Sequence, residues 1–535
     1  MEKIGGVPVC PGVALGELYV WERASAPPAA EGGGPARELE RLLRARDRAE
    51  EILEEQYRLA LSRLGQDEAD IFRLHRMMLE DPDFWAAARG PVEAGQAGAR
   101  AAALAAGETF ARQLRALEDP YLRARADDVA EAARLLAAQL DGGEAPLTLP
   151  GPVILAADAL DPGELLTLDR DKVLGLALGR AAPSGHWAIL ARAMGLPAVT
   201  GVEIAPTWSG RQAGLDGETG ELWLEPDGET RGRLQARSRT QAAAADAQTR
   251  AARAPAVTRS GKQIEVCANI GKPEEAAQAL AQGADGVGLF RTEFLCLGRA
   301  DCPGEEEQFL ACRWAAQALE GRRVTIRTLD LGGDKRTPWL PPEEGENPAL
   351  GLRGIRLTLA RPDLFVPQLR AILRAAAFGK LAVMFPMVTS PGEVDRARAL
   401  LDDCRRQLEA EGIPTGPMEV GVMVETPAAA LLAHELARRV DFFSIGTNDL
   451  TQYTLAADRQ SPALAGLWDQ RNPAVWELIA RTAQAGKAAG IRVAVCGQLA
   501  ADREMTGRLL EAGVDELSVP PADVPAVKAR VRELD

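Results

Sequence analysis

The sequence predicts a multidomain α/β protein whose C-terminal half is a (β/α)8 barrel of the TIM type. Eight short apolar runs follow one another after residue 255, Ala- and Leu-rich helical stretches separate most of them, and most runs end at a polar residue. A doubly wound sheet is the alternative, but eight strands in a chain segment of this length favour the barrel. The runs are 264–269, 286–290, 324–326, 381–385, 420–424, 442–445, 492–495 and 516–519.

Two of these runs are each followed by an acidic residue at the C-terminal end. The run 442–445 stops at Gly446 and is followed by Asn448 and Asp449, and the run 420–424 ends at Glu425. In a barrel of parallel strands the active site lies at the C-terminal strand ends, so these side chains should meet there. Carboxylate oxygens are hard ligands, and we therefore expect Glu425 and Asp449 to form a site for Mg²⁺.

Arginines occupy other strand ends and nearby loops. A single arginine in a loop is usually a solvated surface residue. Four of them around a carboxylate pair predict a pocket for a small phosphorylated anion, because guanidinium groups bind phosphate and carboxylate oxygens bidentately. Cys496 directly follows the run 492–495, and this position at a strand end distinguishes it from the six other cysteines. The predicted substrate-side residues are Arg291, Arg327, Arg353, Arg459, Asn448 and Asp449.

The N-terminal half is organised differently. Strand-like segments within 1–22 and 143–230 predict one α/β domain, and the intervening residues 23–142 are helical in pattern and predict an inserted bundle. Pro82, Pro91 and Pro120 are expected to divide this bundle into shorter helices. Residues 231–254 predict a polar linking helix, and the barrel should occupy 255–535.

Composition excludes several classes of protein. The net charge of −15 disfavours nucleic-acid binding, and no stretch of about 18 apolar residues predicts a membrane span. The N-terminal residues lack the apolar core of a signal peptide, so a cytoplasmic location is expected. Seven scattered cysteines without a CxxC pair predict neither a disulfide framework nor a zinc site.

His186 is the second focus of the sequence. Pro183 and Gly185 precede it as turn residues, and 187–194 reads as a helix that Gly195 ends. The free N–H groups at a helix start favour a negative charge, so a phosphorylated imidazole would be stabilised there. A capping or buried histidine is the simpler reading of such a residue. His75 and His434 lie within helical patterns and are interpreted as packing or surface residues.

Taken together, these motifs resemble enzyme I of the bacterial phosphoenolpyruvate:sugar phosphotransferase system. The resemblance extends over essentially the whole chain, and its strength lies in the combination and order of the motifs. The segments that carry it are 8–16, 77–81, 119–129, 183–197, 288–294, 327–335, 347–356, 384–387, the strand before Glu425, Asn448 with Asp449, and Cys496 with Gly497.

The resemblance implies roles for individual residues. Phosphoenolpyruvate would bind in the barrel with Mg²⁺ on Glu425 and Asp449, and His186 of a phosphohistidine α/β domain would take its phosphoryl group. Cys496 would protonate the pyruvate enolate. Arg291, Arg327, Arg459 and Asn448 would hold the substrate together with Arg353, or with Arg356, between which the sequence does not choose.

The resemblance also implies partners and movement. The phosphoryl group would pass to the phosphocarrier protein HPr, docked on the insert 23–142, in the first step of sugar uptake. One histidine cannot serve both sites without moving, so its domain should swivel about the linker 231–254. The barrel is expected to form a homodimer.

Two departures and two alternatives remain. The family's usual Gly-Gly-Arg-Thr-Ser before the histidine is replaced at 181–185, where Ser184 is a candidate for the threonine's role, and Gln498 stands where a glutamate is usual. Phosphoenolpyruvate synthase or pyruvate phosphate dikinase is one alternative, but the chain shows no Gly-rich nucleotide loop. A regulatory protein with a decayed site is the other: the altered residues before His186 favour it, whereas the complete set of arginines, carboxylates and cysteine argues against it.

Overall fold

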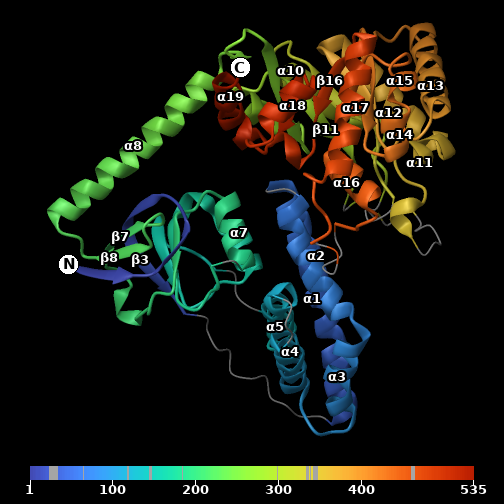
Figure 1. Cartoon of the computed structure of the whole chain (residues 1–535). Coiled ribbons are helices and arrows are strands. Elements are labelled where there is room, and N and C mark those ends of the chain that lie inside the picture. Colours follow the sequence, from blue (N-terminus) through green and yellow to red (C-terminus); the bar gives the residue numbers. More distant parts are fainter. Residues whose placement is uncertain are drawn as a thin grey trace. The chain divides into compact units, whose positions relative to one another are not determined.

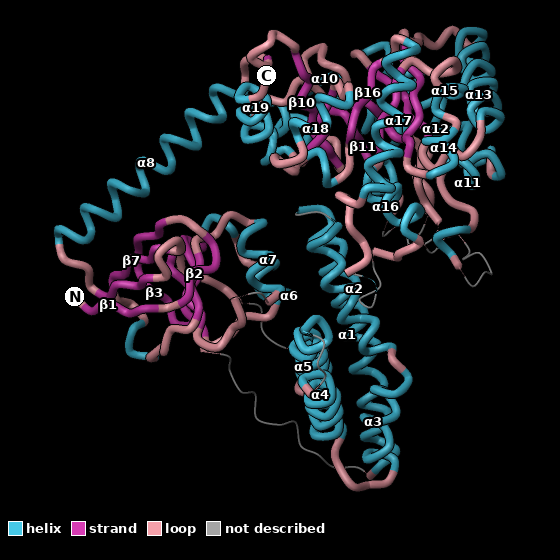
Figure 2. Tube along the Cα trace, in the orientation of Figure 1, coloured by secondary structure: helices cyan, strands magenta, loops and turns pink. Residues whose placement is uncertain are grey.

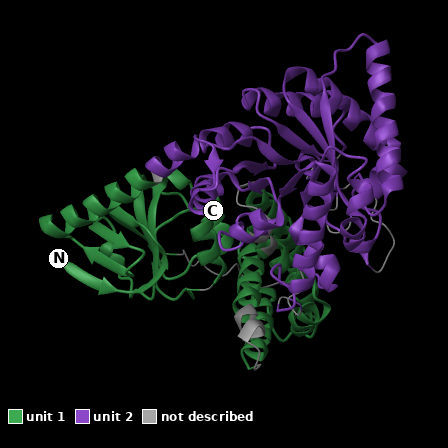
Figure 3. Cartoon of the chain, turned by 45° about the horizontal axis from the view of Figure 1, so that its top comes forward, with its two compact units in different colours: residues 1–244 green, residues 245–535 purple. Residues whose placement is uncertain are grey.

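The chain forms two compact units, Met1–Ala244 and Ala245–Asp535 (Figure 3). The computed structural model describes all residues except 23–33, 64–65, 117–119, 144–146, 184, 298, 300, 333–336, 338, 341–346, 460–463 and 465, and it leaves out the side chains of 62–63, 66–67, 70, 120–125 and 245. Ser184 and most of the boundary between the first strands and the helical insert therefore lie outside the described residues.

The first unit is built on one eight-stranded mixed sheet in the order β1-β8-β7-β3-β4-β5-β6-β2. The first three strands join strands from beyond the helical insert: β1 pairs with β8 in antiparallel fashion, and β3 pairs with β4 in parallel. The chain on both sides of the insert thus shares one sheet. The strands are β1 (Glu2–Gly5), β2 (Val7–Cys10), β3 (Val13–Trp21), β4 (Val153–Ala157), β5 (Val173–Leu178), β6 (Ala198–Thr200), β7 (Gln212–Asp216) and β8 (Glu221–Leu224).

Among the described residues between β3 and β4, the chain forms the helices α1 to α5, which carry blue to teal colours in Figure 1. Pro82 and Pro120 each stand at the first position of a helix, where the missing N–H costs nothing. Pro91 was expected to interrupt the bundle, but it lies inside the last turn of its helix, which continues to Glu93. The helices are α1 (Pro35–Arg63), α2 (Gln66–Glu80), α3 (Pro82–Glu93), α4 (Ala99–Arg115) and α5 (Pro120–Leu140).

Three further helices complete the region before the barrel: α6 (Pro162–Thr167), α7 (His186–Ala193) and the long α8 (Gly228–Ala252). Both ends of α8 are anchored. Near its start, Arg237 pairs with Asp216 and Glu218 of the first unit. At its end, Lys528 Nζ donates to the carbonyl of Ala252 at 2.9 Å.

The second unit is a closed parallel barrel, as the sequence predicts (Figure 2). Eight strands pair in sequence order, and β10 closes the ring by pairing with both β11 and β17. All eight predicted runs are strands of this barrel, and β9 (Ala256–Val257) adds a short antiparallel partner to β10. The barrel strands are β10 (Gln263–Ile270), β11 (Val287–Arg291), β12 (Val324–Arg327), β13 (Leu381–Phe385), β14 (Met418–Val424), β15 (Phe442–Ile445), β16 (Arg492–Val495) and β17 (Glu516–Val519).

Helices surround the barrel and bury its outer face. The main apolar core lies between strands and helices, and a smaller cluster that includes Met384, Phe442 and Cys496 lies separate from it. No helix among the described residues has the length and apolar character needed to cross a membrane. The helices are α9 (Glu275–Ala281), α10 (Glu305–Ala318), α11 (Ile355–Ala360), α12 (Pro362–Ala375), α13 (Pro391–Ala410), α14 (Pro427–Leu431), α15 (Ala433–Leu436), α16 (Thr447–Leu455), α17 (Pro473–Ala489), α18 (Thr506–Ala512) and α19 (Val524–Glu533).

Candidate functional site

His186 is the first residue of α7, as expected from the turn residues before it. Gly185 is the N-cap residue and has an extended backbone. Thr200 and Trp187 hold the preceding turn, because the Thr200 hydroxyl donates to Ala181 O at 2.6 Å and Trp187 Nε1 donates to Ala182 O at 2.8 Å. The imidazole is thus carried on an ordered helix start rather than on a loose loop.

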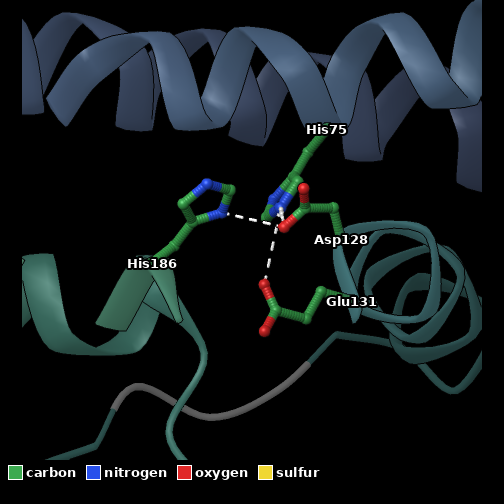
Figure 4. Close-up of side chains that lie close together, drawn as sticks. All are labelled: His75, Asp128, Glu131 and His186. Carbon is green, nitrogen blue, oxygen red and sulfur yellow. Dashed lines mark ion pairs between the residues drawn. The ribbon is translucent and has the colours of Figure 1, made fainter. Parts of the chain in front are cut away.

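Three side chains from the helical insert surround this imidazole (Figure 4). His186 Nδ1 lies 2.9 Å from Asp128 Oδ1. His75 Nε2 lies 3.8 Å from the same oxygen and 3.4 Å from Glu131 Oε2. The two imidazole centroids are 5.9 Å apart. The insert and the α/β sheet therefore share one polar cluster inside the first unit.

The two carboxyl groups of the cluster differ in electrostatics. Burial alone raises the pKa of Asp128, but the imidazoles of His186 and His75 outweigh burial and hold that pKa below its usual range. Burial, followed by the charge of Asp161, raises the pKa of Glu131 to about 8. At neutral pH Asp128 is ionised, whereas Glu131 is largely protonated.

The sequence interpretation of His75 was incomplete. His75 is buried in a helix, as a packing residue would be, yet it faces Asp128, Glu131 and His186. Asp128 lies in the segment 119–129 that carries the family resemblance, but the sequence pattern indicates no role for it. The sequence signal was weak because α2, α5 and α7 bring these residues together only by tertiary packing, whereas a strand end can be read locally.

In the second unit, polar side chains gather at the C-terminal ends of the strands. Arg327, the last residue of β12, is buried and pairs with Glu293, which follows β11. It also lies 3.3 Å from Asp330. Burial lowers the pKa of Arg327, but Glu293 and Asp330 outweigh it, so the guanidinium stays charged. Neither carboxylate was among the predicted site residues.

Arg353 links the carboxylates of Asp330 and Asp449. Its Nε donates to Asp330 Oδ1 at 3.1 Å, and its Nη2 donates to Asp449 Oδ2 at 3.2 Å. Tyr453, one turn of α16 beyond Asp449, lies 3.3 Å from Arg353 Nη1. Arg356 is instead half-buried, and within the described part of the chain its guanidinium donates to the carbonyl of Leu350 at 3.5 Å. Of the two candidates, the structure brings Arg353 to the predicted metal ligand.

Glu425 is buried at the end of β14, and a strained backbone supports it. The N–H of Met387 donates to Glu425 Oε1 at 2.6 Å, and Met387 has a φ of +56°, which is uncommon for a residue with a side chain. Gly354, with a φ of +57°, packs against this turn: a Cβ there would lie 2.8 Å from that of Met387. Such strain is typical of functional sites.

The charge around Glu425 fits a bound cation. Burial, then the charges of Asp449 and Asp330, raise the pKa of Glu425 to about 8 even though Arg327 and Arg353 act in the opposite direction. Three carboxylates thus crowd a buried position, and a divalent ion would relieve their repulsion. The donors are all hard oxygens, which suit Mg²⁺.

Cys496 follows β16 and is buried. Burial raises the pKa of its thiol to about 11, although a hydrogen bond with Ser444 and the arginines Arg327 and Arg291 lower it. The thiol is therefore protonated at neutral pH. Burial and the positive charges of Arg327 and Arg459 lower the pKa of Arg291, so these guanidinium groups lie within electrostatic reach of one another.

Asn448 lies beside the unusual glutamine. Its Oδ1 accepts a hydrogen bond from the backbone N–H of Gln498 at 3.0 Å. The side-chain oxygen of Gln498 accepts from Gln470 Nε2 at 2.6 Å, and Gln470 in turn accepts from the hydroxyl of Thr447 at 2.7 Å. Gln498 thus belongs to a neutral hydrogen-bonded chain, where a glutamate would bring a charge.

The second unit brings together buried guanidinium groups, carboxylates that could bind a metal ion, and a protonated thiol. The first unit contributes an imidazole in contact with Asp128. A family model described as "PEP-utilising enzyme, PEP-binding domain" matches residues 245–535, which is more than half of the chain. The chain belongs to the phosphoenolpyruvate-utilising enzymes. The models for the N-terminal and mobile domains of these enzymes match residues 5–125 and 149–220.

The sequences of related proteins match this phosphoenolpyruvate-utilising enzyme over its whole chain. It is 36% identical to a phosphoenolpyruvate–protein phosphotransferase of Geobacillus stearothermophilus, over 100% of the chain and 93% of that protein. The corresponding protein of Bacillus subtilis is 34% identical over 100% of the chain and 95% of its own length. A multiphosphoryl transfer protein of Xanthomonas campestris is 41% identical over 99% of the chain, which spans 63% of that longer protein. The family predicted from the motifs is confirmed.

Proposed function

We propose that the chain transfers the phosphoryl group of phosphoenolpyruvate to His186 and then to a histidine of the phosphocarrier protein HPr, and releases pyruvate. The observation that carries the proposal concerns His186 at the start of α7. Its Nδ1 lies in contact with the ionised carboxylate of Asp128, which belongs to α5. The names of the full-length relatives and the match to all three family models support the same reaction.

Asp128 orients the nucleophile in this proposal. A carboxylate beside Nδ1 keeps the imidazole proton on that nitrogen, so the lone pair lies on Nε2, at the opposite edge of the ring. Nε2 attacks phosphorus, and the P–O bond to the enolate breaks as the N–P bond forms. The positive charge that develops on the ring is then stabilised by Asp128 at 2.9 Å.

The barrel residues bind and polarise phosphoenolpyruvate. Arg291, Arg327, Arg353 and Arg459 supply positive charge for the phosphate and carboxylate, and the neutral side-chain amide of Asn448 offers hydrogen bonds to them. Glu425 and Asp449 would hold Mg²⁺, and the ion would supply positive charge to balance that of the phosphoryl oxygens. Asp449 is paired with Arg353 in the structure, so a metal on Asp449 would free this guanidinium for the substrate.

Cys496 serves as the general acid that protonates the enolate carbon. A thiol with a pKa of about 11 holds its proton at neutral pH, and the arginines around it favour the thiolate once the proton has left. The proton moves from sulfur to carbon, and solvent restores the thiol after pyruvate departs.

Labelling tests the proposal directly. Incubation with radiolabelled phosphoenolpyruvate and Mg²⁺ should place an acid-labile label on the peptide that contains His186. His186→Ala should lose the label, and His434→Ala, at an exposed histidine on α15, should keep it. Label on another residue contradicts the proposal. Labelling by ATP in place of phosphoenolpyruvate would point to the synthase or dikinase reaction.

The remaining assignments rest on this reaction. Residues 1–22 and 143–230 form the phosphohistidine domain, 23–142 the docking surface for HPr, 231–254 the linker, and 255–535 the barrel, which forms a homodimer. A cytoplasmic location accords with an intracellular substrate. Light scattering checks the homodimer, cell fractionation checks the location, and titration of the chain with HPr, followed by amide shifts, checks the docking surface.

The reaction also requires His186 to move between the phosphoenolpyruvate site and the site where HPr docks. His186 belongs to the first unit, whereas the arginines and carboxylates belong to the second. We expect the histidine-bearing domain to swivel about the linker. A crosslink that fixes His186 at the barrel should preserve labelling from phosphoenolpyruvate and abolish transfer to HPr; survival of both steps contradicts swivelling.

A further inference from the structure

A second group of potential metal ligands lies away from the barrel. His75, Asp128, Glu131 and His186, the histidine cluster, offer one ligand atom each, and these four atoms all lie within 4.8 Å of one another. They come from α2, α5 and α7, so three separate elements converge on one point (Figure 4).

Two atoms of the histidine cluster point to a ligand independently of this spacing. The side chain of His75 is only 5% exposed, and its Nε2 makes no hydrogen bond within the described residues. Oε2 of Glu131, 3.4 Å away, is also buried without a hydrogen bond there. Buried polar atoms in folded proteins are normally satisfied by protein, water or an ion. Both atoms face the space that the four residues share.

We propose that the histidine cluster binds one divalent transition-metal ion of the zinc class, outside the Mg²⁺ site of the barrel. Two imidazole nitrogens and two carboxylate oxygens form a donor set that suits Zn²⁺, whereas Mg²⁺ prefers oxygen ligands alone. Ligands of a tetrahedral zinc ion lie about 3.3 Å apart, given bonds of about 2.0–2.1 Å. The spacing within the cluster thus needs only small side-chain rotations to enclose the ion.

The ion would inhibit phosphoryl transfer through the chemistry of the imidazole. Nδ1 of His186 is the nitrogen that faces the cluster. A neutral imidazole that binds a metal through Nδ1 carries its one proton on Nε2. Nε2 then has no lone pair with which to attack phosphorus, and Asp128 is diverted from its orienting role. Bound metal and phosphoryl acceptance at His186 therefore exclude each other.

Nitrogen NMR of the full chain tests the site, because the sequence has only three histidines. In protein stripped of metal and labelled with ¹⁵N-histidine, one equivalent of Zn²⁺ should shift His186 Nδ1 and His75 Nε2 together and leave His434 unchanged. A shift of His434 alone, or no shift of His75 and His186 at one equivalent, overturns the proposal.

Variants test the location with a second readout. Co²⁺, a spectroscopic substitute for Zn²⁺, should give the absorption of a tetrahedral site, and His75→Gln and Glu131→Gln should each weaken its binding by at least about tenfold, the loss typical even of residues that only support ligands. His434→Gln is the matched control and should bind as the wild type does. Unchanged Co²⁺ affinity in both cluster variants contradicts the site.

Inhibition separates the histidine cluster from the barrel. For each protein, the rate of His186 labelling by phosphoenolpyruvate is compared with and without one equivalent of Zn²⁺ in excess Mg²⁺. The rate with Zn²⁺ divided by the rate without it should fall below one for the wild type and for His434→Gln. The same quotient should stay near one for His75→Gln. Equal inhibition of His75→Gln would place the ion in the barrel and overturn the proposal, while the labelling itself would still support the proposed function.

Discussion

Cys496 and Glu131 show how burial sets the protonation state of single groups. Both are shielded from water, and both have a pKa that keeps the proton on at neutral pH. For Cys496 this retention supplies a proton donor. For Glu131 it makes the stability of the first unit depend on pH. These two effects lead to separate predictions.

Cys496→Ala should slow pyruvate formation by about 10²–10⁴-fold, the usual contribution of a general acid, because water must then protonate the enolate. Binding of phosphoenolpyruvate should change little, since the guanidinium groups remain. Steady-state rates and equilibrium binding measure the two quantities. Cys404→Ala, at a buried cysteine on α13, is the control and should retain wild-type turnover. A wild-type rate for Cys496→Ala would remove the thiol from the mechanism.

The free energy of unfolding of the first unit should fall as pH rises from about 4.5 to about 8. Over this window the unfolded chain loses the proton of Glu131, whose ordinary pKa is 4.5, while the folded chain retains it up to a pKa of about 8. Glu131→Gln removes this dependence, so the stability of the variant relative to the wild type should increase across the window. Hydrogen exchange of α5 amides at pH 5 and 8.5 measures the difference. No difference between these pH values would contradict the raised pKa.

At the scale of elements, the barrel was predictable and the histidine cluster was not. Each barrel strand is an apolar run whose polar end can be read from neighbouring residues, so all eight runs and the meeting of Glu425 with Asp449 followed from local patterns. Arg353 lies in a loop, and the sequence did not choose between it and Arg356. Glu293 and Asp330 were missed because their pairing with Arg327 depends on how adjacent loops fold back. Asp128 was missed because a helix surface gives no comparable positional signal.

The turn after β13 gives a prediction at the same scale. Gly354→Ala should displace Met387 and its hydrogen bond to Glu425, because the new Cβ would lie 2.8 Å from that of Met387 and the φ of +57° disfavours any side chain. We expect a loss of barrel stability of about 1–3 kcal/mol and weaker binding of Mg²⁺, measured by thermal unfolding and calorimetric titration. Gly392→Ala, where a Cβ meets nothing within 4 Å, is the matched control and should be neutral.

At the scale of the whole molecule, the two units have separate hydrophobic cores, and the proposed function assigns phosphoenolpyruvate to the second unit alone. Phosphoenolpyruvate with Mg²⁺ should therefore raise the unfolding temperature of the barrel unit and leave that of the first unit unchanged. At a free ligand concentration of about 100 Kd the stabilisation should be about 2.7 kcal/mol. Calorimetry of the full chain, with His186→Ala used to prevent turnover, measures both transitions. An equal shift of both would indicate that the units unfold together.

The contacts that anchor α8 at two positions make the number of helical residues between them important. Arg237 is held by Asp216 and Glu218, and Ala252 by Lys528; residues 238–251 between them span about 20 Å of helix. If this stretch stays helical during the relay, its length sets the rotation about the helix axis between the Arg237 ion pairs and the Ala252 carbonyl. One added residue would change that rotation by about 100°, whereas seven would restore it to within about 20°. Tolerance to insertions should then follow the helical repeat and not the number of residues added.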